Sequence, residues 1–448
     1  MWDAREMGTS NNNQTGHNER QSEPGVVGAE LELDVTNVAH GGIFVARHEG
    51  RVVFVNDTLP GERVRVRLTD ANKKSFWRAE TVEVLKAAPE RQPHVWAAAA
   101  VERAPQDRAG GAEFGHIELT HQRELKRQVL ADAFKRMAGI ETDVVVEAVP
   151  VGENASPGDE LDGTGWRTRV RLHVAEDGRV GPYAARSHRV ISVDDLPLAA
   201  HGVEMAAPLD EYFKGAASVD VVGPSTGRVQ IVVAESDAKG KRVATPPRTI
   251  IERVGDREFQ LDVSGFWQVH SSAAQTLTSA VQEAIDESLF DPRADNLDLY
   301  GGVGLLAAAV GDKFGSTTRI TSVESDLRAT EFAGENLSDW VGASAQTDRV
   351  DRFLGRIGRE ASAADRSRQQ AATVVLDPPR SGAGKAVVDA LAVLSPAQIV
   401  YVACDPVALA RDIALFAAHG YQLQKMRAFD LFPNTHHVEA VALLTRQP

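Results

Sequence analysis

The C-terminal part of the chain, from about residue 259 to residue 448, alternates apolar segments of strand length with segments of helical periodicity. This alternation predicts a doubly wound α/β domain, in which parallel strands form one sheet and helices cover both of its faces. In such a sheet the carboxyl ends of the strands meet along one edge, and ligands bind there. The polar residues that follow the apolar segments are therefore the first candidates for a functional site.

Three of these polar residues predict one shared pocket. Cys404, the only cysteine among the 448 residues, directly follows the apolar segment 399–403, and Asp377 ends another apolar segment before two prolines. The prolines fix the backbone and remove two N–H donors, so the Asp377 carboxylate can face a ligand. Glu439 begins a third apolar segment. A lone cysteine is often only a small core residue, and a strand glutamate is often only an edge charge, but the grouping favours a site.

A glycine turn in the same domain predicts a cofactor of the nucleotide type. In residues 296–309 a short apolar strand leads into Gly302, Gly304 and Ala307, which match a G-x-G-x-x-A pattern. Glu324 ends the next strand about 20 residues later, where a carboxylate can bind both hydroxyls of a ribose. This geometry serves a nicotinamide dinucleotide or S-adenosylmethionine, and the polar strand ends described above favour the methyl donor.

Three segments resemble the RNA uracil-5-methyltransferase family, which modifies tRNA and rRNA with S-adenosylmethionine. They are residues 377–380 (Asp-Pro-Pro-Arg), 404–412 (Cys-Asp-Pro-Val-Ala-Leu-Ala-Arg-Asp) and 432–439 (Phe-Pro-Asn-Thr-His-His-Val-Glu). The resemblance implies that Cys404 is a nucleophile that adds to C6 of uracil, and that Glu439 removes the C5 proton after methyl transfer. It also implies that Asp377 helps to position the cofactor.

Two further segments of this family have weaker counterparts in the chain. The segment 266–270 (Phe-Trp-Gln-Val-His) resembles the family's Phe-Phe-Gln-Val-Asn and implies that Gln268 contacts the cofactor. The segment 298–302 (Asp-Leu-Tyr-Gly-Gly) resembles Asp-Leu-Tyr-Cys-Gly and implies the same role for Tyr300. The positions that depart from the family's residues are Trp267, His270 and Gly301. Because a sulfonium is a good leaving group, the reaction requires no metal, and none is predicted.

The N-terminal region predicts a small RNA-binding barrel. Residues 29–90 contain several short strands separated by Gly and Pro turns, which is typical of an OB-like fold, and they resemble the TRAM domain. Arg63, Arg65 and Arg67 alternate with apolar residues and therefore share one strand face. The cations and aromatic residues that follow them suit RNA, although the net charge of −14 argues against it and strand charges are often only solvated. These residues are Lys73, Lys74, Phe76, Trp77 and Arg78.

The remaining segments complete the predicted organisation. Residues 1–28 read as a disordered polar tail, residues 91–258 as a linker with a central α+β substrate domain, and residues 259–448 as the methyltransferase domain. Ala109 and Ala112 flank two glycines where rRNA members of the family carry Cys-Gly-Gly-Cys, so no iron–sulfur cluster is predicted.

The predicted fold class is therefore α/β, a Rossmann-like class I methyltransferase domain with an N-terminal OB-like TRAM barrel and a central α+β domain. The predicted activity is S-adenosylmethionine-dependent methylation of uridine C5 in RNA, with 23S rRNA favoured. The alternatives are a tRNA uracil-5-methyltransferase and a non-catalytic RNA-binding protein. A cytosine-5 enzyme is disfavoured because RNA enzymes of that kind use two cysteines. With no membrane-spanning run and no apolar signal core, the chain is expected to be a cytoplasmic monomer with no membrane partner.

Overall fold

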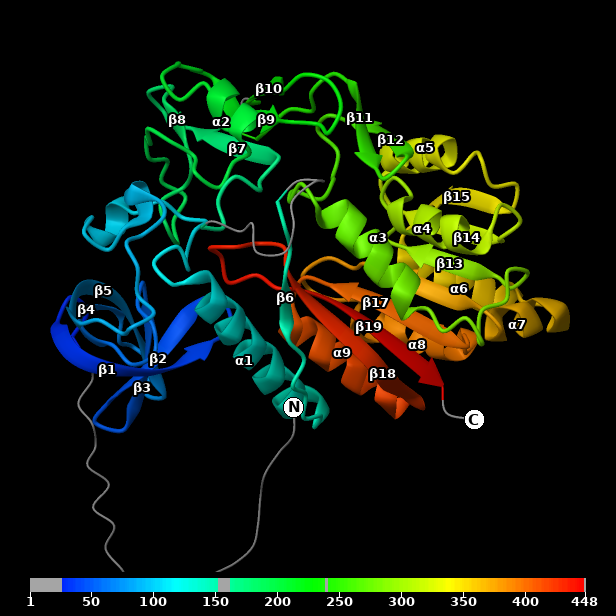
Figure 1. Ribbon diagram of the computed structural model, residues 1–448, viewed down its shortest axis with the longest axis horizontal. Coiled ribbons are helices and arrows are strands. Elements are labelled where there is room, and N and C mark those ends of the chain that lie inside the picture. Colours follow the sequence, from blue (N-terminus) through cyan, green and yellow to red (C-terminus); the bar gives the residue numbers. More distant parts are fainter. Residues whose placement is uncertain (1–25, 152–161, 238–240, 447–448) are drawn as a thin grey trace, which may run out of the picture.

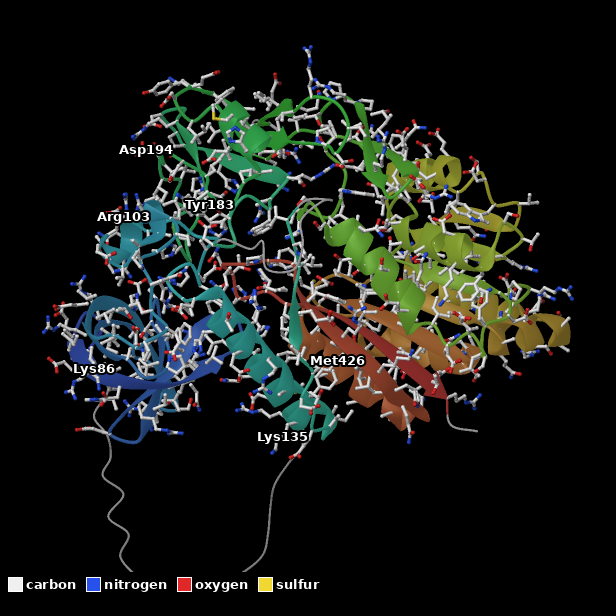
Figure 2. The ribbon with its side chains drawn as sticks, in the orientation of Figure 1. Lys86, Arg103, Lys135, Tyr183, Asp194 and Met426 are labelled. Carbon is white, nitrogen blue, oxygen red and sulfur yellow. The ribbon has the colours of Figure 1, made fainter. Side chains whose placement is uncertain are left out.

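The computed structural model describes residues 26–151, 162–237 and 241–446, and these residues form three units. A barrel, a central unit and a large C-terminal sheet surround helix α1 (Leu119–Ala138) (Figure 1). Figure 2 places Lys86 on the barrel, Tyr183 in the central unit and Met426 on the C-terminal sheet. Residues 1–25 of the predicted N-terminal tail lie outside the described residues.

The N-terminal unit is a closed five-stranded barrel with the strand order β1-β2-β3-β5-β4. Its strands are β1 (Glu30–Ala39), β2 (Ile43–His48), β3 (Arg51–Asn56), β4 (Arg63–Asp70) and β5 (Phe76–Lys86). Apolar side chains alternate along the strands, so Phe44, Val53 and Val64 fill the interior with no exposed surface. Closure removes the free sheet edges that a small antiparallel sheet would otherwise expose.

The central unit holds a four-stranded antiparallel sheet with the order β10-β9-β7-β8, followed by a separate hairpin of β11 and β12. The sheet strands are β7 (Arg169–Val174), β8 (Val180–Gly181), β9 (Ala216–Val222) and β10 (Gln230–Glu235). The remaining elements are the short helices Ala97–Ala99 and Pro105–Asp107, α2 (His201–Ala206), β11 (Thr249–Val254) and β12 (Arg257–Asp262). Ala109 and Ala112 are buried in the core of this unit.

The C-terminal sheet has eight strands in the order β15-β14-β13-β16-β17-β19-β18-β6. The strands are β6 (Val146–Ala148), β13 (Asn296–Leu299), β14 (Ile320–Glu324), β15 (Ala343–Thr347), β16 (Thr373–Leu376), β17 (Gln398–Ala403), β18 (Tyr421–Asp430) and β19 (Glu439–Arg446). The five strands from β13 to β17 are parallel, as predicted. The sheet as a whole is mixed, because β19 runs antiparallel to both β17 and β18.

Helices cover both faces of this sheet, as the alternating pattern predicts. They are α3 (Ala273–Ala284), α4 (Leu305–Phe314), α5 (Leu327–Asn336), α6 (Val350–Glu360), α7 (Ala363–Gln370), α8 (Gly384–Leu394) and α9 (Pro406–Ala418). One apolar core lies between the sheet and α3 and α4, and a second lies between the opposite face and α1, α6, α8 and α9. Two elements that precede residue 259, α1 and β6, thus belong to the C-terminal layers, because long-range pairing recruits them.

Helix α1 is joined to the segment after β18 by a fully buried ion pair. Lys126 Nζ lies 2.5 Å from Asp430 Oδ1 and donates to the Phe432 carbonyl at 3.0 Å. Both side chains are almost completely withdrawn from solvent. Burial lowers the pKa of Lys126, and the Asp430 charge opposes that effect. The pair therefore fixes the helix to the chain that leads into β19.

The replacement Lys126→Met should lower the free energy of unfolding by about 3–5 kcal/mol, because it leaves Asp430 as an uncompensated buried charge. Lys126→Met/Asp430→Leu should recover most of that loss. Lys135→Met is the matched control on the exposed part of α1, and it should change stability by less than about 0.5 kcal/mol. Urea denaturation followed by circular dichroism measures all three, and a stable Lys126→Met variant would contradict the expectation.

Candidate active site

A cavity of about 1380 Å³ lies at the carboxyl ends of the parallel strands, where the sequence analysis placed the site. Each of the predicted site residues lines it, although they come from segments far apart in the chain. These residues are Gln268, Tyr300, Glu324, Asp377, Cys404 and Glu439. The tertiary structure therefore brings all of the sequence candidates into one space.

The glycine turn after β13 forms one wall of the cavity and is held by Glu324. Glu324 Oε1 accepts the backbone N–H groups of Ser325 and Asp326 at 2.5 and 2.8 Å, and Oε2 accepts that of Gly302 at 3.3 Å. Gly302 and Gly304 have positive φ angles of 53° and 90°, so the turn requires glycine. The Glu324 carboxylate is thus fixed at the strand end, in a position suited to a ribose.

Gly301, a departure from the family's cysteine, is required by its neighbours. A Cβ atom at this position would lie 2.0 Å from Ser322 Oγ and 2.5 Å from Asp298 Oδ2. Ser322 Oγ donates to Asp298 Oδ2 at 3.0 Å, and the Ala307 N–H donates to the same oxygen at 3.2 Å. This buried hydrogen-bond group fills the space that a side chain at residue 301 would need.

Cys404 stands between a buried strand and a capped helix. All residues of β17 before it are buried, and Asp405 after it caps α9, accepting the N–H groups of Val407 and Ala408 at 3.0 and 2.8 Å. Burial raises the pKa of the Cys404 thiol to about 12, with additional contributions from the charges of Glu439 and Asp377. The thiol therefore keeps its proton at neutral pH when the cavity holds no ligand.

Two carboxyl groups beside the thiol have pKa values far above their usual range. Burial, together with the charge of Asp298, raises the pKa of Asp377 to about 7. Burial, together with the charge of Asp377, raises the pKa of Glu439 well above that of an ordinary glutamate, while Arg380 acts in the opposite direction. Two neighbouring carboxyl groups with raised pKa values, the buried Glu439 and the half-buried Asp377, are suited to general acid–base chemistry near neutral pH.

The loop that follows Asp377 is held by Asp412 of α9. Asp412 Oδ2 accepts the Ala383 N–H at 2.7 Å and the Gly384 N–H at 3.2 Å, and the Tyr401 hydroxyl donates to it at 2.7 Å. Asp412 is fully buried. The last residue of the 404–412 segment thus holds the loop that follows the 377–380 segment.

Several residues outside the predicted set of site residues also line the cavity. Phe266 is 74% exposed, which is unusual for a phenylalanine, and Arg380 lies 3.3 Å from His437 Nε2 through its Nη2 atom. Arg328 reaches the far end and pairs with Asp262 at 2.8 Å. Phe266, Arg380 and His437 lie inside segments that carry the family resemblance, so their positions in the motifs were the only available signal.

The cavity fits S-adenosylmethionine in size and in chemistry. Its volume accommodates a ligand of nucleotide size together with a base. The glycine turn after β13 lets the backbone come close to a ligand, and Glu324 offers a fixed carboxylate. Leu327 and Phe332 supply apolar surface at the same end. Within the described parts of the chain, no group of three or more His, Cys, Asp or Glu side chains could hold a metal ion.

The barrel arginines predicted to face RNA are mostly neutralised. They do share one face of β4, but Arg63 pairs with Glu32 at 3.2 Å, Arg67 pairs with Glu30 at 3.0 Å, and Arg65 pairs with Glu83. The β1 and β5 glutamates are brought opposite them by strand pairing, which the local sequence window could not reveal. The cross-strand pairing thus compensates the three arginine charges.

A second barrel surface combines cations with aromatic rings. The Lys73 ammonium lies 4.6 Å from the centre of the Phe76 ring, and the Arg51 guanidinium lies 4.2 Å from that of Trp77. Lys73, Lys74 and Arg78 are exposed, and no ion pair joins them to the carboxylates of the described residues. We refer to Arg51, Lys73, Lys74, Phe76 and Arg78 as the barrel patch. Such a surface suits stacking and phosphate contact with RNA.

Comparison with known proteins gives two family matches and several long relatives. The tRNA (uracil-5-)-methyltransferase family matches residues 251–447, and the TRAM domain matches residues 25–77. An uncharacterized RNA methyltransferase of Streptomyces coelicolor is 37% identical, covering 94% of each chain. Another from Bifidobacterium longum is 32% identical over 96% of this chain and 100% of its own.

A solved structure has the same fold over most of the chain. The crystal structure of Pyrococcus abyssi tRNA (uracil-54, C5)-methyltransferase in complex with S-adenosyl-L-homocysteine superposes with a TM-score of 0.64 at 21% identity. It covers 92% of this chain and 100% of that protein. This likeness confirms the predicted fold class, including the N-terminal barrel. None of the helices in the described parts of the chain has the length and apolar character of a membrane span.

The replacement Asp377→Asn should change the pH dependence of stability. Because the folded carboxyl holds a proton that the unfolded chain has already released between about pH 4 and pH 7, wild-type stability falls as pH rises through this range. The neutral amide of the variant removes that dependence. The free energy of unfolding of the variant should therefore rise relative to wild type by about 2.7 kcal/mol between pH 5 and pH 8, measured by urea denaturation. Parallel pH curves for the two proteins would contradict the raised pKa.

Proposed function

Because this chain belongs to the RNA uracil-5-methyltransferase family and carries a TRAM domain, we propose that it methylates C5 of a uridine in RNA through a covalent bond between Cys404 and C6. The observation that carries the proposal is the position of Cys404, Asp377 and Glu439 in one cavity with the glycine turn and Glu324. S-adenosylmethionine, when bound, supplies a methyl group on a positively charged sulfur. Gln268, Tyr300, Glu324 and Asp377 are the residues proposed to hold it.

The first step gives the uracil ring its nucleophilic carbon. Cys404 reacts as the thiolate after its proton passes to solvent, and the sulfur electron pair forms the bond to C6. The C5–C6 π electrons shift to C5 and O4 as an enolate, so that C5 would be the carbon methylated, and the S–C bond pair would stay with the cofactor sulfur, which leaves as a neutral thioether. Arg380 favours the thiolate, because its positive charge opposes the rise in the thiol pKa.

The second step removes the proton that C5 retains. Glu439, once ionised, takes this proton, the C5–C6 double bond forms again, and the thiolate leaves C6. Burial makes the Glu439 carboxylate a stronger base than an exposed glutamate, because it raises the pKa. The target uridine has to leave its stack or loop to enter the cavity.

We propose 23S rRNA as the substrate, with tRNA as the alternative. The barrel supports the ribosomal assignment only against those tRNA members of the family that lack a TRAM domain. The Pyrococcus abyssi protein, which modifies uracil-54 of tRNA, supports the alternative through its fold. Mapping of 5-methyluridine in rRNA and tRNA from a deletion strain decides between them. We also propose that the protein acts in the cytoplasm as a monomer without an iron–sulfur cluster.

Replacing Cys404 or Glu439 should stop the reaction at different steps. Cys404→Ala should abolish methylation and give no covalent complex, because nothing adds to C6. In Glu439→Gln the Cys404 sulfur should still add to C6, and C5 should still be methylated. This variant cannot remove the C5 proton, so a covalent protein–RNA adduct should accumulate. Denaturing gel electrophoresis with labelled RNA detects the adduct. Normal turnover by Glu439→Gln without an adduct would show that another group is the base.

The barrel patch should contribute to the salt dependence of RNA binding, whereas the paired arginines should not. Lys73→Gln/Lys74→Gln should weaken binding and reduce the slope of log K against log salt by up to about 1 to 2, since each lost phosphate contact lowers that slope by about 0.7 to 0.9. Arg65→Gln is the matched control, because its charge is already compensated by Glu83 and Glu32. Filter binding of rRNA fragments at several salt concentrations measures the affinity and the slope for each protein. Equal slopes for the wild type and both variants would show that the barrel patch does not contact RNA phosphates.

A further inference from the structure

A second chamber lies behind the nucleophile, between the barrel and the C-terminal unit. Its volume is about 160 Å³, and Cys404 and Arg380 line both it and the main cavity. We call it the barrel chamber. Its wall includes the barrel turn 39–42, Val129 of α1 and the segment 404–406. The turn between β1 and β2 of the barrel is thus part of the surroundings of the thiol.

The barrel turn is tied to the catalytic segment by direct contacts. His40 Nε2 lies 2.8 Å from Asp405 Oδ2, and Asp405 is the residue after Cys404. The Asp405 contact raises the pKa of His40. Gly42 approaches His436 so closely that a Cβ atom at residue 42 would lie 3.0 Å from the His436 Cβ atom. The chamber therefore has a defined wall on its barrel side.

Arg380 is the cation that makes the barrel chamber suited to an anion. The other charged lining groups already face carboxylates, since His40 lies beside Asp405 and His436 lies 3.5 Å from Glu113, and burial lowers the pKa of His437 to about 3, so that imidazole is neutral. Lys126 is occupied by Asp430, whereas Arg380 makes no ion pair with a carboxylate of the described residues. Arginine binds phosphate oxygens in two-pronged geometry. Arg380, placed at the junction of the two spaces, can therefore contact an anion that continues from a ligand in the main cavity.

The size of the barrel chamber selects among the parts of an RNA chain. A volume of about 160 Å³ is well below the roughly 300 Å³ of the smallest usual ligand pockets, so the chamber suits a small group better than a whole nucleotide. A phosphate group, with one phosphorus and four oxygens, fits this space. A uridine whose C6 meets the Cys404 sulfur necessarily has its own backbone phosphates nearby.

We propose that the barrel chamber binds a phosphodiester group adjacent to the target uridine, so that the turn 39–42 of the TRAM barrel is part of the substrate site. This inference rests on the proposed uridine chemistry at Cys404. It assigns the barrel a role beyond general RNA affinity. The barrel would hold the backbone on one side of the thiol while the base occupies the other side.

The test uses the full-length protein and three small probes in the presence of S-adenosylhomocysteine. Binding of uridine, uridine 3′,5′-bisphosphate and inorganic phosphate is measured by ligand-observed NMR titration. We expect the bisphosphate to bind at least tenfold more tightly than uridine. Inorganic phosphate should bind more weakly than the bisphosphate, because it lacks the base. Equal affinity of inorganic phosphate and the bisphosphate would overturn the assignment to the RNA backbone.

Two variants address the barrel chamber without touching the main cavity. Val129→Phe fills the space from α1, and His40→Gln removes the imidazole while it retains a hydrogen-bond donor toward Asp405. Both should lose the advantage of the bisphosphate over uridine and keep the affinity for uridine. Arg65→Gln, on the outer face of the barrel, should keep the full advantage. If both chamber variants retain it, the proposal is overturned.

The readout is independent of methyl transfer. Failure of the Cys404 and Glu439 adduct experiment would overturn the uridine chemistry itself. Normal adduct formation together with equal binding of uridine and its bisphosphate would overturn the barrel chamber alone.

Discussion

The structure depends on one buried junction, formed by α1 and the segment between β18 and β19. Asn434 is fully buried with a positive φ of 64°, and its N–H and side-chain oxygen exchange hydrogen bonds with Gln122 of α1 at 2.7 and 2.9 Å. Its amide donates to the Asp162 and Gly163 carbonyls at 2.9 Å, and its own carbonyl accepts the Phe114 N–H at 3.0 Å. With the Lys126–Asp430 pair, this residue joins the linker, the central unit and the sheet immediately before Glu439. An unpaired polar group here would be costly, so the junction specifies a single arrangement.

Burial is also what gives the site its chemistry. Asp298, Asp377 and Glu439 lie in surroundings that disfavour their charged forms, and each pKa is raised. The same desolvation raises the pKa of the thiol. The Cys404 thiol therefore keeps its proton at neutral pH, whereas Asp377, with a pKa of about 7, exchanges its proton in this range. The network around Asp412 and the capped α9 hold the loop after Asp377 and the segment after Cys404 in place.

The barrel has two distinct surfaces with respect to RNA. Its arginine strand is neutralised by the glutamates of neighbouring strands, whereas the barrel patch keeps exposed cations next to aromatic rings. The turn after β1 faces the methyltransferase domain, where His40 contacts Asp405, the residue after Cys404. A small domain that reads as an independent RNA-binding module thus also contributes its β1–β2 turn to the wall of the chamber beside Cys404.

The sequence by itself determined the parallel strands from β13 to β17, the glycine turn and the candidate residues, because periodicity, glycine patterns and strand-end motifs are local properties. The antiparallel β19, the recruitment of α1 and β6, and the pairing of Arg63, Arg65 and Arg67 were decided only by the tertiary structure. Each of these features depends on partners distant in the chain, which no sequence window contains. The raised pKa values of Asp377 and Glu439 belong to the same class, since burial is a property of the folded packing and not of the residue.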